Sequence, residues 1–301
     1  MFQTVHDYSG FHAAARCVSG GPIYITDIPG EHDIDLINQM TGLTPRGKTI
    51  IFRPSVLGKS IDQYVGYDDN SLLKVGAYHG QAVTGTSIMG VFNISSRPLT
   101  DIIPLQRFPG VLSSMRYIVR AHSTGKVSKP VQTGLPASML TVSLGVRGWD
   151  IFTAYPLDIL HTETRGTVYV ANLGLVGKMT GSAAILRSSF DLEHNGRVFL
   201  DTTVKALGVL GRLQQAPVYD ILSTNRTMFL GVYISVLPDL TIEGDFMVTI
   251  QGKPIPPKTV SVSKHDPHVV EIDVEAAWNE MKLEAGWANE VEVKLYFTLE
   301  H

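Results

Sequence analysis

Asp27 is the residue of this chain whose type and position point most directly to chemistry. It follows the β-branched and aromatic run Ile23–Thr26, which the sequence predicts as a buried strand, and it precedes a Pro-Gly turn. In parallel (β/α)8 barrels, a carboxylate at the C-terminal end of a strand reaches the mouth of the active site, because the strand ends converge there. The structural alternative is a cap of the turn Asp27–Gly30, and the residue alone does not decide between the two.

His6, Asp7 and His12 are close enough in sequence to raise the question of a metal or acid/base cluster. Their spacing fits neither two histidines one helical turn apart nor a closed zinc site, and the single cysteine, Cys17, offers no cysteine ligand set. We therefore expect structural histidines here. The sequence predicts no bound metal and no cofactor.

The glycine-rich segment Gly174–Ala183 has a superficial likeness to a phosphate-binding loop. That motif needs Ser or Thr directly after Gly-Lys, where this chain has Met179, and an earlier glycine, where it has Asn172. A glycine-rich turn is the better interpretation. Elsewhere no nucleophile stands beside a base at a recognisable spacing, and we predict no catalytic residue in this chain.

The elements that would position Asp27 form one αβα step. Phe11–Val18 has apolar residues at helical spacing, and Gly20 and Gly21 then end the helix. After the predicted strand, Asp33 can cap a second helix, which we expect Gly42 to close. Such a step belongs to a parallel α/β fold and cannot form a sheet alone.

Beyond about residue 47, short strand-like runs alternate with turns almost to the end of the chain. The runs are KTIIFR, LLKVGAY, SIMGVFNI, RYIVRAH, LTVSLGV, IFTAYPL, TVYVAN, RVFLDTTVKALGVLG, MFLGVYISVL, DFMVTIQG, HVVEIDV and EVKLYFTL. Many short strands with little helix between them predict an antiparallel sandwich or barrel. VEAAWNEMKLEAGW is the one later stretch with a helical pattern.

Composition narrows the class of protein. The 301 residues are 44% hydrophobic and 18% charged, with a net charge of -3, so the chain predicts a globular protein without a basic field for nucleic acid. One cysteine favours a reducing, cytoplasmic location. No apolar run approaches the roughly 20 residues that span a bilayer, so we expect no membrane partner. We attribute the glycosylation triplets at Asn93 and Asn225 to chance.

Several stretches together resemble one family. Met1-Phe2-Gln3, His6, FHAAAR, GGPIYITD, Pro29-Gly30 and His32 are similar to the segment that follows the Asp-Trp-Asp-Met-Phe-Gln motif of the raffinose synthase, seed imbibition protein and alkaline α-galactosidase family, of the glycoside hydrolase family 36 type. Further on, LLKVGAY, GVFN, GWDIFTAYPL, GLVGKMTGSAAI and VEVKLYFTL follow the family in the same order. The likeness is dense over residues 1–33 and thinner beyond.

The resemblance implies an architecture. In the family a catalytic (β/α)8 barrel precedes an antiparallel β domain, so the expected fold is mostly β. Residues 1–45 are expected to be the last βα unit of a (β/α)8 TIM barrel, truncated, and residues 46–301 an antiparallel β-sandwich domain. Isolated barrel strands expose apolar surface and unpaired edges, so residues 1–45 should be loosely ordered, docked on the β domain or prone to association.

The resemblance also assigns residues to a sugar site. Carried over by position, Asp27 lies at the end of the eighth barrel strand, while Phe2, Gln3 and His6 follow the seventh, so these four are predicted to line the substrate site. His12 and Arg16 fall on the intervening helix, where packing is expected. Retaining glycosidases need two carboxyl groups about 5 Å apart, and both lie upstream in the family.

The function expected from this resemblance is that of the C-terminal part of a glycoside hydrolase or galactosyltransferase acting on raffinose-type α-galactosides. Without the catalytic Asp pair, we expect the chain alone to be inactive; the sequence leaves open whether it is an enzyme, whether the parent hydrolyses or transfers, and its oligomeric state. The alternative is a non-catalytic β-sandwich module that binds sugar or a protein. That role needs exposed aromatic side chains, and Trp149, Trp278 and Trp287 are the tryptophans available.

Overall fold

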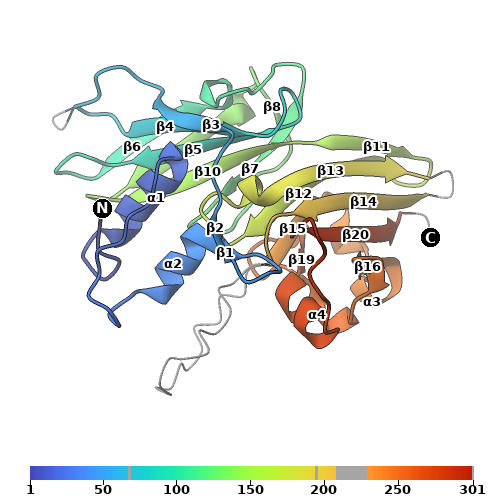
Figure 1. The fold of residues 1–301 in the computed structure, drawn as a ribbon. Helices are drawn as coiled ribbons and strands as arrows, with labels where there is room; N and C mark the ends of the chain where they lie inside the picture. The colour runs from blue at the N-terminus through green and yellow to red at the C-terminus, as the bar shows by residue number, and fades with distance from the viewer. Residues whose placement is uncertain (67–68, 194–195, 208–228, 300–301) are drawn as a thin grey trace. The chain divides into compact units, whose positions relative to one another are not determined.

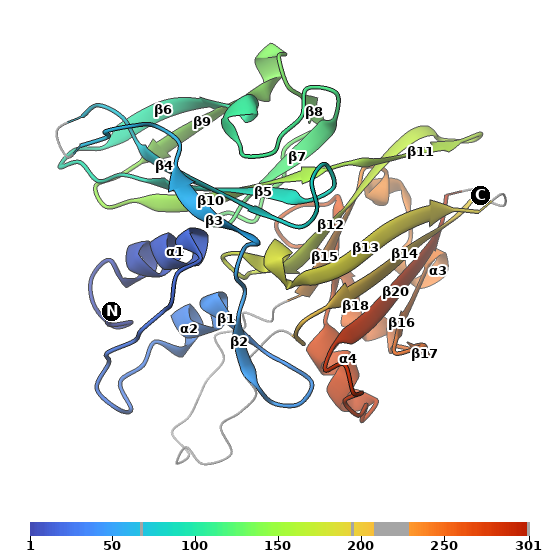
Figure 2. The same ribbon diagram turned by 45° about the horizontal axis from the view of Figure 1, so that its top comes forward.

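A computed structural model describes residues 1–66, 69–193, 196–207 and 229–299 (Figures 1 and 2). The chain divides into two compact units. The first consists of Met1–Met40 and Arg53–Leu157, and the second of Thr41–Phe52 and Asp158–His301. Most described residues of regular structure lie in strands, which confirms the expectation of a mostly β protein. The triplet at Asn225 lies outside the described residues.

The first unit is built on a six-stranded antiparallel sheet in the order β3-β4-β5-β10-β7-β8. Two helices precede this sheet in sequence, and β6 pairs with β9 as a separate antiparallel hairpin. The elements are α1 (Ser9–Ser19), α2 (Ile34–Met40), β3 (Val56–Ser60), β4 (Leu73–His79), β5 (Thr86–Phe92), β6 (Leu99–Pro104), β7 (Arg116–Ala121), β8 (Val131–Gln132), β9 (Met139–Leu144) and β10 (Trp149–Pro156).

Both faces of the six-stranded sheet are covered. On one face α1 packs against β3, β4, β5 and β10, and the Phe11 ring meets the Phe92 ring edge-on with centroids 5.2 Å apart. On the other face Met89 and Val91 join a core with Ile103 of β6 and other residues of the β6–β9 hairpin. Because side chains alternate along a strand, this double cover accounts for the burial of every residue of β5. Residues 1–45 were expected to be loosely ordered, docked on the β domain or prone to association. Of these, α1 is docked on the six-stranded sheet.

The two helices begin and end largely as their sequences predict. Gly20 follows α1 in the left-handed conformation, with φ 69°, and its N–H donates to the carbonyls of Arg16 and Cys17. The Asp33 carboxylate accepts the Leu36 N–H at 2.9 Å and so caps α2. The expectation that Gly42 closes α2 was wrong, because Gly42 pairs with Ile50 in a hairpin.

The buried strand predicted at Ile23–Thr26 was also wrong in extent. The segment forms a single parallel bridge, between Ile25 and Phe2, and the Tyr24 side chain is 60% exposed. A ladder needs partners along its length, and within the described part of the chain the backbone hydrogen bonds of this segment go to Phe2.

The second unit contains two five-stranded antiparallel sheets, β11-β12-β15-β19-β18 and β13-β14-β20-β16-β17, and the hairpin β1–β2 (Figures 1 and 2). Side chains of both sheets, of α4 and of Phe52 form one hydrophobic core. The elements are β1 (Thr41–Leu43), β2 (Thr49–Ile51), β11 (Asp158–Thr162), β12 (Gly166–Val176), β13 (Ile185–Leu192), β14 (Arg197–Val204), β15 (Phe229–Ile234), α3 (Ile242–Asp245), β16 (Phe246–Ile250), β17 (Lys253–Pro254), β18 (Val260–Val262), β19 (Val269–Ile272), α4 (Val274–Glu280) and β20 (Val291–Thr298).

The compact units do not divide at residue 45. Met1–Met40 shares a unit with Arg53–Leu157, whereas the hairpin within Thr41–Phe52 belongs to the other unit. The predicted domains, 1–45 and 46–301, describe which domain of a longer enzyme each segment would belong to. They are not the same as compact units, and they stay a prediction.

Candidate functional site

The candidate site is the end of two parallel backbone segments joined through α1. The Phe2 N–H donates to the Tyr24 carbonyl at 3.1 Å, and the Thr26 N–H donates to the Phe2 carbonyl at 3.0 Å. Because the two segments run in the same direction, the residues that follow them lie at the same edge. Thr4 and Asp27 are the polar residues that meet there.

The Asp27 carboxylate is held by Thr4 and His32. One oxygen accepts the Thr4 backbone N–H at 2.6 Å, and the other accepts the Thr4 hydroxyl at 2.5 Å and lies 3.0 Å from His32 Nδ1. The Thr4 hydroxyl in turn accepts the Asp33 N–H at 2.8 Å, so one threonine ties both segments to the start of α2. The Asp27 side chain is fully covered, while the His32 side chain is 37% exposed.

These contacts set the charge of Asp27. Burial acts to raise the pKa of the carboxyl, but the hydrogen bonds from the Thr4 hydroxyl, from His32 and from the Thr4 N–H outweigh it and hold the pKa below its ordinary value. Asp27 is therefore an ionised acceptor at neutral pH. A carboxylate in this state holds loops together and is poorly suited to donate a proton.

Phe2 is buried, and Arg16 covers its ring. The guanidinium carbon lies 4.9 Å from the ring centroid, and Arg16 also donates to the carbonyls of Met1 and His12 at 2.9 and 3.1 Å. Burial lowers the pKa of His12, and the positive charge of Arg16 lowers it further. The packing role expected for His12 and Arg16 agrees with these contacts.

Gln3 and His6 are placed differently from each other. The Gln3 side-chain amide donates to the Thr26 carbonyl at 3.4 Å, so Phe2, Gln3 and Asp27 come together around the bridge. His6 is exposed in the following turn, where its carbonyl accepts the Ser9 N–H. Among the described residues, no hydrogen bond joins the His6 ring to the other three side chains.

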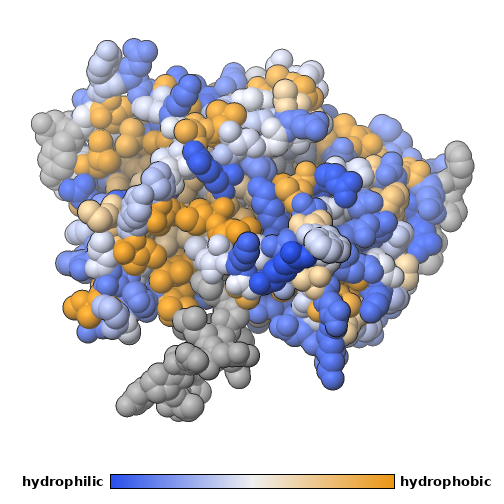
Figure 3. Space-filling view, in the orientation of Figure 1, coloured by the Kyte–Doolittle hydropathy of each residue, from blue (hydrophilic) through white to orange (hydrophobic). Residues whose placement is uncertain are grey.

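Apolar side chains are exposed around this edge. Hydrophobic surface gathers over the part of the view that holds α1 and α2 (Figure 3). The exposed large apolar side chains of residues 1–40 are Met1, Val5, Tyr8, Tyr24, Ile28 and Ile34. Residues 1–40 thus carry exposed apolar side chains as well as the face of α1 that packs on the sheet.

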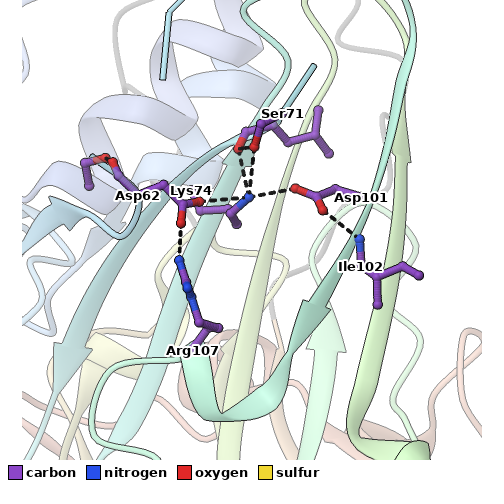
Figure 4. A network of polar contacts seen from close by, with 8 residues as sticks. Asp62, Ser71, Lys74, Asp101, Ile102 and Arg107 are labelled. Carbon is purple, nitrogen blue, oxygen red and sulfur yellow. Dashed lines mark hydrogen bonds and ion pairs between the residues drawn. The ribbon is translucent and has the colours of Figure 1, made fainter. Parts of the chain in front are cut away.

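A second polar cluster, which the sequence did not indicate, lies on the other face of the six-stranded sheet (Figure 4). The Lys74 ammonium lies 2.6 Å from an Asp101 carboxylate oxygen and 2.9 Å from one of Asp62, and it donates to the Leu72 carbonyl. Asp62 also pairs with Arg107. Both carboxylates are engaged by the same lysine, whereas the two carboxyl groups of a glycosidase must face the glycosidic bond from opposite sides. The cluster therefore joins β4 and β6 to the segment before β4, which holds Asp62, and to the segment after β6, which holds Arg107.

The remaining chemistry-bearing features are structural in the described residues. Lys178 of the glycine-rich segment is buried and donates to the Thr41 carbonyl at 2.5 Å. Residues 1–66, 69–193, 196–207 and 229–299 contain no group of three or more His, Cys, Asp or Glu side chains placed to hold a metal ion. No helix within these ranges is long and apolar enough to cross a membrane.

Sequence reasoning found Asp27 but missed Thr4 and His32. Thr4 precedes any recognisable element, and its hydroxyl acts across 23 positions, so no local pattern announces it. His32 stands five residues after Asp27 in a Pro-Gly turn, a spacing that could have indicated a pair.

Comparisons with known proteins locate the likeness along the chain. Residues 1–97 match the family model described as "Raffinose synthase or seed imbibition protein Sip1". A probable galactinol–sucrose galactosyltransferase 6 of Arabidopsis thaliana is 27% identical over 223 residues, which are 64% of this chain and 28% of that protein. A stachyose synthase of Pisum sativum is 30% identical over 113 residues, 36% of this chain and 12% of that protein.

This chain thus spans well under half the length of these curated relatives. Among solved structures, an α-galactosidase from Saccharomyces cerevisiae with raffinose aligns at a TM-score of 0.38 and 9% identity, over 52% of this chain and 46% of that one. An α-galactosidase I from Mortierella vinacea aligns at a TM-score of 0.32 and 12% identity, over 51% and 38%.

Proposed function

Since this chain is related to the raffinose synthase and seed imbibition protein family, as its sequence predicts, we propose that it is the C-terminal part of an enzyme that acts on α-galactosides. The observation that carries the proposal is the match over residues 1–97. That range contains the paired ends at Phe2 and Ile25, the Asp27 contacts and the start of the six-stranded sheet.

Within such an enzyme, we propose that residues 1–45 supply one wall of the sugar site, as the final βα unit of a (β/α)8 barrel, and that the β domain supports it. Phe2, Gln3, His6 and Asp27 are the proposed wall. The Thr4 and His32 contacts support a positioning role for Asp27, because its covered carboxylate already makes three such contacts. His32 and His6 are the more exposed groups of the edge.

The chain alone is proposed to have no turnover. Glycoside cleavage with retention needs a nucleophilic carboxylate and a protonated carboxyl about 5 Å apart. The Asp27 carboxylate is engaged by Thr4 and His32, and Asp62 and Asp101 are both paired with Lys74, so these three carboxyl groups are held in structural contacts. The parent reaction, hydrolysis or transfer, would depend on groups supplied by the rest of the barrel.

The test is release of p-nitrophenol from p-nitrophenyl α-galactoside by the purified chain. We expect no release above a blank without protein, either from the chain or from the Asp27→Ala variant prepared in the same way. A rate clearly above the blank that survives in the variant would contradict the proposal, because it would require a carboxyl pair within the chain.

The second candidate function is a non-catalytic sugar-binding module. The observation in its favour is the Trp287 side chain, which is 95% exposed, whereas Trp278 is 5% exposed and belongs to the core. The two candidates are compatible, since an enzyme can carry a second saccharide contact on a β domain.

A further inference from the structure

Trp287 is placed at the tip of a turn. The Asn289 N–H donates to the Gly286 carbonyl at 3.3 Å, and Asn289 has a positive φ of 54°, so the chain reverses around Trp287 and Ala288. A fully exposed indole forgoes the stabilisation that its burial would give, of the order of 25 cal/mol per Å². Its side chain therefore adds little to the hydrophobic core of the unit.

The turn is held in place by the β1–β2 hairpin. The Arg46 N–H donates to the Asn289 side-chain oxygen at 2.9 Å, and the Arg46 guanidinium lies 5.8 Å from the Trp287 ring. Arg46 and Asn289 are 243 positions apart in sequence, yet the hairpin and the turn that contain them both belong to the second unit. Trp287 is thus an exposed flat apolar surface with the Arg46 guanidinium, a group of hydrogen-bond donors, close to its ring.

The charges around Trp287 favour a neutral ligand. Arg46, Lys48 and Lys282 bring positive charge to the two segments, and Glu284 and Glu290 bring negative charge. Because positive and negative side chains lie within a few residues of each other, the electrostatic potential here favours neither an anion nor a cation. A neutral molecule rich in hydroxyl groups can use both the donors and the acceptors.

The size of the apolar surface favours a small ligand over a protein. Over residues 44–48 and 282–290, Trp287 is the one large apolar side chain that is exposed, since Leu283 packs against the core. A stable protein interface buries about 1,200–2,000 Å² and places its aromatic anchors in a desolvated centre. One isolated indole offers only the area of a sugar ring.

We propose that Trp287 and Arg46 form a saccharide-binding contact on the second unit, in which a galactosyl ring stacks on the indole and Arg46 donates to its hydroxyl groups. The galactosyl class rests on the proposed function. It also fits the surface, because one face of galactose carries C–H bonds in place of hydroxyls and can lie flat on an aromatic ring.

The test measures binding of galactose, raffinose and glucose to the full chain by saturation-transfer NMR, a readout that does not need the indole as reporter. We expect galactose and raffinose to bind and Trp287→Ala to weaken them roughly tenfold. Arg46→Ala should weaken the binding of both sugars by a smaller factor. It should also reduce the saturable change in tryptophan fluorescence that these sugars produce. Tyr64→Ala is the matched control, because Tyr64 is 96% exposed in the first unit, and it should bind as the unchanged chain does.

Three results would overturn the inference. If none of the three sugars binds, the saccharide contact is excluded. The proposed function would still be tested separately, by the p-nitrophenyl α-galactoside assay. Unchanged binding by Trp287→Ala would place the saccharide elsewhere. Equal binding of glucose and galactose would exclude the galactosyl assignment.

Discussion

The buried amine of Lys178 joins distant parts of the second unit. It donates to the Thr41 carbonyl and lies 6.0 Å from the Phe52 ring, and the neighbouring Thr180 hydroxyl donates to the Phe52 carbonyl at 2.7 Å. The glycine-rich segment therefore fastens both ends of the β1–β2 hairpin. Burial lowers the pKa of Lys178 to about 7, although the Glu275 charge acts to raise it.

We expect the stability of the second unit to rise with pH between about 7 and 10.5. The unfolded chain keeps a proton on Lys178 over this range while the folded chain loses it, so alkaline pH favours the folded state. Lys178→Met should remove this rise, because the methionine side chain does not titrate, and it should also leave the Thr41 carbonyl without this hydrogen bond. Urea unfolding at several pH values measures both effects, and an unchanged slope in the variant would contradict the assignment.

Asn93 is a buried residue whose side-chain amide makes four hydrogen bonds to the backbone. Its side-chain nitrogen donates to the carbonyls of Arg97, Leu144 and Gly145 at 2.8, 3.1 and 2.9 Å, and its oxygen accepts the Ser95 N–H. The side chain is completely covered, so the glycosylation triplet at this position is inaccessible in the folded chain.

Asn93→Asp should therefore destabilise the first unit by more than about 2 kcal/mol, because a carboxylate would face three carbonyl oxygens. Acidification should restore part of the loss, since a protonated carboxyl can donate one hydrogen bond. Asn70→Asp makes the same change at an exposed position and serves as the control. Equal unfolding free energies for the two variants would refute the role of Asn93.

Strands at the centre of each sheet were predictable, and strands at the edges were not. In the described residues, the inner strands of the three large sheets, such as β5, β15 and β20, all coincide with runs identified from the sequence. The outer strands, β3, β8, β11, β13, β17 and β18, were all missed. An inner strand is buried by its neighbours, so its sequence is an apolar run that predicts a strand. The outer strand β13 is exposed along much of its length, and its mixed sequence does not predict a strand.

The candidate site was predictable only where local sequence signals mark it. Asp27 follows an apolar run and precedes a turn, which are local signals. The contact that fixes it comes from Thr4, across the whole of α1, and depends on how the two segments pair. Tertiary placement of this kind has no signature in a single sequence.

The close approach of β3 to α1 depends on Gly58. A Cβ atom at this position would lie 2.6 Å from the Val18 carbonyl oxygen and 3.0 Å from the Ser19 Cα, both backbone atoms that cannot turn aside. Gly58→Ala should lower the unfolding free energy by about 1–3 kcal/mol. Gly145→Ala, where no atom lies within 4 Å, should stay within about 0.5 kcal/mol. Chemical denaturation compares them, and a neutral Gly58→Ala would show that α1 can move away.

Hydrogen exchange can test the single parallel bridge. The Thr26 amide donates to the Phe2 carbonyl, whereas the Ile25 N–H points away from Phe2, so Thr26 should exchange more slowly than Ile25. Both should exchange faster than Cys17 in the middle of α1. Strong protection throughout Ile23–Thr26 in a monomer would mean that a further strand pairs with this segment.

At the scale of the whole molecule, the two compact units should unfold in separate transitions. Ala14 is fully buried in the face of α1 that packs on the six-stranded sheet, so Ala14→Asp places a charge in that interface. We expect calorimetry to show one transition at lower temperature and the other unchanged, with added binding of a hydrophobic dye. A uniform shift of a single transition would show that the chain unfolds as one cooperative body.

The division of the units also orders the events of synthesis on the ribosome. The β1–β2 hairpin is synthesised before Lys178 and Thr180, which hold it and which emerge more than a hundred residues later. At the usual 5–20 residues per second this interval is roughly 6–25 s. Throughout it Phe52 lacks its final core, which makes the nascent hairpin a natural place for a chaperone to bind.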